Sequence, residues 1–181
     1  MDTVTDILEF AAQHADYWTE FLSGQDYSNE LSPEETKALD AAREHIEEAI
    51  YDLLQACGDG LAERLEDYGI PRKAFQRGAT STNRYVRTDA PEPLTEQLYG
   101  FRFELSPDKR NERILLYGSL IVKKKFLDEI LARLTKAKET FDVADYYLYG
   151  PGIPLERERP FRALAGTASE TLAKLFTAAM K

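Results

Sequence analysis

The sequence predicts an α+β protein with a helical first part and a small, mostly antiparallel sheet in its second part. Apolar residues recur every three or four positions up to about residue 70, whereas later segments alternate or form short apolar runs between turns. The charge changes at the same place: residues 1–70 contain 18 Asp and Glu against 3 Lys and Arg, and residues 71–181 contain 14 against 20. We therefore expect an acidic helical subdomain over 1–70 and a basic α+β subdomain over 71–181, as two units or one continuous domain.

The first part is expected to be a helical hairpin followed by a short third helix. Residues 4–22 place their apolar side chains on one helical face. The sequence Ser-Pro-Glu-Glu at 32–35 is a capping box, so a second helix starts there and runs to about Cys57. The sequence Gly-Asp-Gly at 58–60 is expected to stop this helix, which leaves 61–68 as the third one.

The sequence of the second part predicts the element order ββαβα. A Ser-Pro-Asp turn connects the first two strands, and a helix, a tyrosine-rich strand, a Gly-Pro turn and a closing helix follow. The expected ranges are 98–105 and 113–122 for the strands, 126–138 for the helix, 143–149 for the third strand, 150–154 for the turn and 167–180 for the closing helix. The basic stretch before them, 72–88, is expected to contain at most a short strand at 85–86. In the strand at 98–105, alternation places Tyr99, Phe101, Phe103 and Leu105 on one side and Arg102 and Glu104 on the other. The core between the two strands and the helix at 126–138 is expected to include Phe103, Leu116, Leu120 and Ile130.

Composition restricts the compartment and the class of protein. The hydrophobic fraction of 43% and the charged fraction of 30% are typical of a globular chain, and the formal net charge is −9. Cys57 is the single cysteine, so a disulfide within the chain is excluded and a reducing cytoplasm is expected. The acidic N-terminal residues do not resemble a secretory signal, and no apolar run is long enough for a membrane span.

Four acidic residues follow one face of the second expected helix at steps of four. Like charges at this spacing destabilise a helix by a few tenths of a kcal/mol each, roughly 0.2–0.5. Three interpretations are open: a solvated outer face, a docking surface for a basic protein partner, or a surface that pairs with the basic stretch of the same chain. The residues of this acidic row are Asp40, Glu44, Glu48 and Asp52.

The basic stretch has the composition of a nucleic-acid-binding loop, in which cations meet phosphates and aromatic rings stack on bases. The alternative is a structural role, in which the basic stretch neutralises the charge of the acidic helices. The residues of this basic set are Arg72, Lys73, Arg77, Arg84, Tyr85 and Arg87.

No motif assigns a catalytic residue, a cofactor or a metal. His14 and His45 lie on the two arms of the expected hairpin, but the Glu-x-x-His spacing of bundle metal sites is absent. The tyrosine-rich sequence at 146–149 could line a pocket, although tyrosines are also ordinary strand residues. An enzyme with a pocket beside this strand is therefore a third hypothesis.

The function favoured by the sequence is a non-catalytic protein that presents the acidic row to a basic partner, as an inhibitor, immunity protein or antitoxin does. A nucleic-acid-binding module that uses residues 72–87 is the alternative. Neither a membrane partner nor an oligomeric state is predicted.

Overall fold

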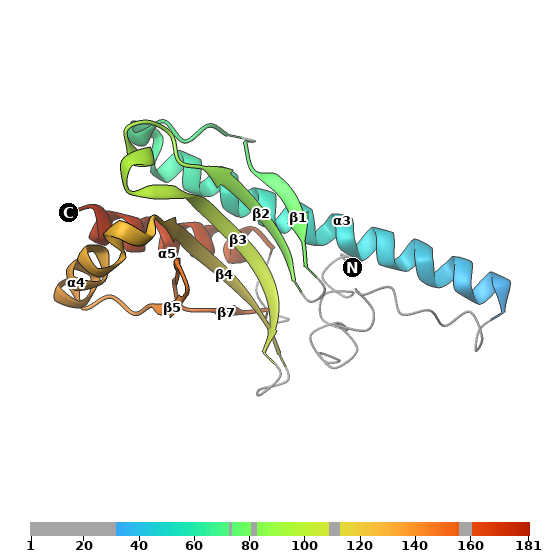
Figure 1. Cartoon of the computed structure of the whole chain (residues 1–181). Helices are drawn as coiled ribbons and strands as arrows, with labels where there is room; N and C mark the ends of the chain where they lie inside the picture. The colour runs from blue at the N-terminus through green and yellow to red at the C-terminus, as the bar shows by residue number, and fades with distance from the viewer. Residues whose placement is uncertain (1–31, 73, 81–82, 109–112, 156–160) are drawn as a thin grey trace.

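The computed structural model describes residues 32–72, 74–80, 83–108, 113–155 and 161–181 (Figure 1). Two long helices, α3 (Pro33–Arg64) and α5 (Phe161–Met180), pack on one face of a seven-stranded antiparallel sheet. A shorter helix, α4 (Leu127–Ala137), packs against α5. The predicted α+β class is confirmed. The helix expected at residues 4–22 lies outside the described residues.

The predicted stop at 58–60 is wrong, because α3 runs as one helix of 32 residues from Pro33 to Arg64. A Cβ atom at Gly58 would lie 2.6 Å from the Phe75 ring, and one at Gly60 would lie 2.7 Å from Ser169 Oγ of α5. These glycines therefore serve close packing of the helix and do not end it. The expected third helix is the last part of α3 and a single 3₁₀ turn, η1 (Glu66–Tyr68).

The sheet has the strand order β1-β2-β3-β4-β6-β5, and β7 also pairs with β4. All of these pairings are antiparallel. The strands are β1 (Gln76–Ala79), β2 (Arg84–Asp89), β3 (Leu98–Asp108), β4 (Arg113–Val122), β5 (Asp142–Ala144), β6 (Tyr147–Tyr149) and β7 (Ile153–Pro154). Two 3₁₀ turns, η2 (Leu94–Glu96) and η3 (Lys124–Phe126), flank the central strands.

Several element boundaries differ from the sequence expectations. The basic stretch is the β1–β2 hairpin and not a loop with a short strand. The third expected strand is the β5–β6 hairpin, since Asp145 adopts a left-handed conformation with φ of 54° and reverses the chain. The turn expected at 150–154 includes β7, and α5 begins at Phe161 rather than at residue 167.

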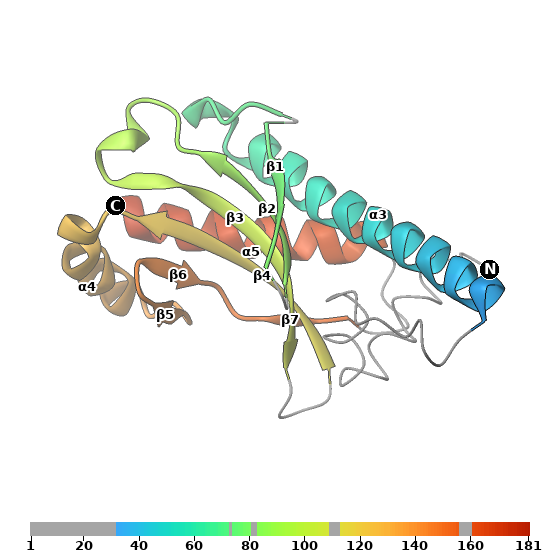
Figure 2. The same cartoon turned by 45° about the vertical axis from the view of Figure 1, so that its right-hand side comes forward.

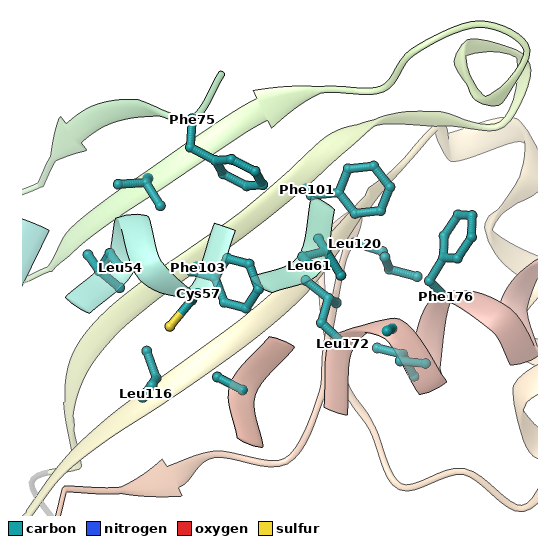
Figure 3. Close-up of a cluster of buried hydrophobic side chains, with 14 of the residues drawn as sticks. Leu54, Cys57, Leu61, Phe75, Phe101, Phe103, Leu116, Leu120, Leu172 and Phe176 are labelled. Carbon is teal, nitrogen blue, oxygen red and sulfur yellow. The ribbon is translucent and has the colours of Figure 1, made fainter. Parts of the chain in front are cut away.

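The core lies between the sheet and the layer of α3 and α5 (Figure 3). In Figure 3, Cys57 and Leu61 of α3 meet Phe103 of β3 and Leu172 of α5. The four residues predicted for the core, Phe103, Leu116, Leu120 and Ile130, are fully buried. Burial also raises the pKa of the Cys57 thiol, which is therefore a packing residue and not a reactive one.

Candidate functional site

The face of the sheet turned away from α3 and α5 collects most of the polar and aromatic strand residues, and we call it the outer face. Strand alternation sends Phe101 and Phe103 into the core and leaves Arg102 and Glu104 on the outer face. The register then aligns side chains across the strands in rows. These outer-face rows are Tyr85, Glu104 and Tyr117; Arg87, Arg102, Ser119 and Tyr149; and Asp89, Gly100, Ile121 and Tyr147.

A line of planar groups crosses the outer face from β2 to β6. The Arg102 guanidinium lies 3.9 Å from the Tyr85 ring centroid and 5.5 Å from that of Tyr147. Tyr147 in turn stacks on Tyr146 at 4.7 Å and on Tyr149 at 6.0 Å. Arginine over aromatic rings contributes about 0.5–2 kcal/mol per contact, more when it is desolvated. This line therefore fixes the tyrosines of the β5–β6 hairpin in place.

Glu104 pairs with Arg102 beneath this line, and both side chains are largely buried. Burial raises the pKa of Glu104, and the neighbouring Arg102 opposes the rise. Burial and the charge of Glu104 also raise the pKa of Tyr149 to about 12. The Arg102 Nε and Ser119 Oγ atoms are buried without a hydrogen-bond partner among the described residues. The centre of the outer face is thus polar and protected from solvent.

A groove of about 520 Å³ lies next to this centre. Two of its rings are exposed to solvent, Tyr99 by 56% and Tyr146 by 41%, and their centroids are 6.3 Å apart. The Lys123 ammonium lies 5.6 Å from the Tyr99 ring. The groove is lined by Arg87, Asp89, Tyr99, Ile121, Lys124, Tyr146 and Tyr147. Exposed aromatic faces and cations are thereby combined in one concave surface.

The position of Tyr99 differs from the sequence expectation. Simple alternation placed it on the core side with Phe101, but the β3–β4 register shifts between Leu98 and Gly100. A Cβ atom at Gly100 would lie 2.0 Å from the Thr88 carbonyl oxygen, so only glycine fits there. The irregularity turns Tyr99 outward into the groove.

The basic set divides between the two faces. Arg84 pairs with Glu47 at 2.5 Å and Arg77 pairs with Glu48 at 2.7 Å, so both guanidinium groups contact α3. Arg72 lies 3.3 Å from Glu63, also on α3. Tyr85 and Arg87 belong to the outer face, and Lys73 lies outside the described residues. Of these three carboxylates only Glu48 belongs to the acidic row, so the interpretation that the row pairs with the basic stretch applies to one ion pair, and Glu47 and Glu63 lie outside the row.

The acidic row keeps only part of its charge free for a partner. Asp40 forms an ion pair with Arg43 at 3.3 Å. The hydrogen bond from Arg77 lowers the pKa of Glu48. Glu44 and Asp52 are exposed and have no ion pair with another described residue. The row is brought together on one helix, as the sequence predicts, but Glu48 is held by β1.

A second cavity, of about 670 Å³, lies where α3, α4 and α5 end. Its arginines serve the helix termini: Arg64 donates to the Gly60 carbonyl at 3.1 Å and Arg133 donates to the Ala179 carbonyl at 2.9 Å. Lys174 pairs with Glu170 at 2.7 Å. Cations are expected at helix C-termini, so the basic rim of this cavity has a structural explanation.

Three further findings concern metals, membranes and relatives. Within the described ranges, no group of three or more His, Cys, Asp and Glu side chains could hold a metal ion, and His45 is exposed. No described helix is both long and apolar enough to cross a bilayer. No family model, curated protein or solved structure matches the chain.

Proposed function

We propose that this chain is a non-catalytic nucleic-acid-binding protein that holds a single strand on the outer face of its sheet. The observation that carries the proposal is the groove in which the exposed rings of Tyr99 and Tyr146 lie beside Lys123, Lys124 and Arg87. Bases stack on exposed aromatic rings, and lysine and arginine attract the phosphates between them. The proposal keeps the sequence hypothesis of nucleic-acid binding but moves it from the arginines that contact α3 to the groove.

The net charge of −9 is compatible with this function because the charges are separated. Figure 2 shows the acidic helix α3 packed along one side of the sheet. The strand residues that line the groove belong to the outer face, on the other side. Exposed charges separated by more than the Debye length, which is about 8 Å at physiological salt, are largely screened. Three acidic residues of α3, Glu47, Glu48 and Glu63, are in addition paired with arginines.

The acidic row supports a second candidate function, the capture of a basic protein partner. Glu44 and Asp52 are exposed, and the N-terminal half of α3 extends beyond the sheet (Figure 1). Reversal of both charges, Glu44→Lys with Asp52→Lys, is expected to slow association with such a partner and to flatten its salt dependence. These substitutions are expected to leave binding at the groove unchanged.

Fluorescence anisotropy with labelled ten-nucleotide single strands of DNA and RNA tests the first proposal. We expect Tyr99→Ala and Tyr146→Ala each to weaken binding by about 5- to 150-fold, because one stacked base contributes about 1–3 kcal/mol. Lys124→Ala is expected to weaken binding and to reduce the slope of log K against log salt by about 0.7 for a single strand. Tyr68→Ala is the matched control, since Tyr68 is 39% exposed and packs against Phe176 on the helix side.

Failure of wild-type protein to bind either strand at low salt would refute the proposal. Equal binding by wild type and the Tyr99 and Tyr146 variants would place the nucleic acid elsewhere on the chain.

A further inference from the structure

Asp89 is a carboxylate that lines the groove together with Arg87 and Lys124. Phosphate binding and base stacking do not account for a negative charge at this position. Asp89 and Arg87 are two residues apart on β2, so both point from the outer face and both line the groove. Residues two apart on a strand are about 7 Å apart. Among the described residues, neither side chain is within 4 Å of an opposite charge.

A carboxylate is a poor neighbour for a phosphate, because it only accepts hydrogen bonds and carries the same charge. Its position in the groove therefore indicates a ligand group with N–H donors at that point. Among the nucleobases, guanine presents two adjacent donors, N1–H and the N2 amino group, which match the two oxygens of one carboxylate. Guanine also presents O6 and N7, which accept the two parallel hydrogen bonds of an arginine fork.

Building on the proposed function, we propose that the groove binds an unpaired guanine. Asp89 accepts hydrogen bonds from N1–H and N2–H, Arg87 donates to O6 and N7, and the base stacks on the tyrosines of the groove. The Watson–Crick edge must be free for Asp89, so a guanine within a duplex is excluded. The spacing of about 7 Å along the strand lets the two side chains approach two neighbouring edges of one purine.

The test compares seven-nucleotide strands of thymidine with one central position changed to guanine, hypoxanthine or 7-deazaguanine. Hypoxanthine lacks the N2 amino group that faces Asp89, and 7-deazaguanine lacks the N7 that faces Arg87. Wild-type protein is expected to bind the guanine strand about 5- to 100-fold more tightly than the all-thymidine strand, as a good bidentate base contact gives. The two modified bases are expected to lose part of this preference.

The protein variants are matched to the base changes. Asp89→Asn is expected to bind guanine and hypoxanthine equally, while its preference for guanine over 7-deazaguanine persists. Arg87→Lys is expected to show the reverse pattern. Asp142→Asn is the control, because Asp142 is an exposed carboxylate at the edge strand β5 and does not line the groove.

The alternative outcomes distinguish failure of this inference from failure of the proposed function. Equal wild-type affinity for all four strands, with binding still dependent on Tyr99, would overturn guanine recognition and retain single-strand binding. If Asp89→Asn weakened the binding of all four strands by the same factor, Asp89 would have a structural role, and this result would also overturn the inference. Absence of binding to any strand would overturn both.

Discussion

Removal of Glu47 is expected to destabilise the fold because it takes a carboxylate away from the largely buried Arg84 guanidinium. The Arg84 side chain is 8% exposed and the Glu47 side chain is 39% exposed, and the contact joins Nε to Oε1 at 2.5 Å. Arg84 Nη1 also donates to the Thr80 carbonyl at 3.2 Å. Breaking a buried pair costs about 3–5 kcal/mol and breaking an exposed pair about 0–1 kcal/mol. Since only one partner is buried, we expect Glu47→Ala to lower the free energy of unfolding by about 2 kcal/mol.

Urea denaturation and calorimetry of Glu47→Ala, Arg84→Ala and the double variant measure the pair in a double-mutant cycle. For a chain of this size, 2 kcal/mol corresponds to a fall in Tm of about 4–8 °C. The neighbouring pair of Glu48 and Arg77 is the control, because its side chains are 58% and 49% exposed. Its coupling is expected to stay below about 1 kcal/mol and to vanish in 1 M salt, whereas that of the Arg84 pair persists. A Glu47→Ala variant within 0.5 kcal/mol of wild type (roughly the effect of a featureless surface change) would refute the burial argument.

Three other substitutions test the core, the buried carboxylate and the helix junction. Leu116→Ala is expected to cost about 2–5 kcal/mol in urea denaturation, because Leu116 is fully buried between the sheet and the helices. Glu104 has a raised pKa, so its contribution to stability is present below the unfolded value of 4.5 and is lost as the pH rises through its folded pKa. The free energy of unfolding of Glu104→Gln, minus that of wild type, is therefore expected to increase from pH 4 to pH 7. The same difference at both pH values would contradict the raised pKa of Glu104. Arg133→Ala is expected to cost about 1–3 kcal/mol in thermal melts, because the Ala179 carbonyl loses its charged donor. Lys174→Ala is the control, because Lys174 forms an exposed ion pair, and it is expected to change stability by less than about 0.5 kcal/mol.

The elements predicted best are those set by local pattern. The strand expected at 113–122 has the same limits as β4, because its apolar run is bounded by a turn and by lysines. The start of α3 at Pro33 follows from the Ser-Pro-Glu-Glu pattern at its N-terminus. Both signals depend only on neighbouring residues.

The elements missed depend on contacts between distant residues. Gly58 and Gly60 have the composition of a helix stop, but Phe75 and Ser169 occupy the space beside them. The groove was anticipated only in part. A pocket was expected beside the tyrosine-rich sequence, and Tyr146 and Tyr147 line the groove. The contribution of Tyr99 was missed, since its outward position arises from a register shift that no periodic pattern indicates. Alternation alone correctly placed Arg102 and Glu104 on the face of β3 opposite to the one that carries Phe101 and Phe103.

Strand parity decides which cations of the basic set are available to an external ligand. Arg77 and Arg84 share the α3 side of the β1–β2 hairpin with the buried Val86, and α3 supplies Glu48 and Glu47 to meet them. Arg87 has the opposite parity on β2 and joins the outer face. The charge split along the chain is therefore partly an internal ion-pair network that attaches the hairpin to the helix. The same hairpin can present Arg87 to a nucleic acid because its other arginines are held on the opposite face.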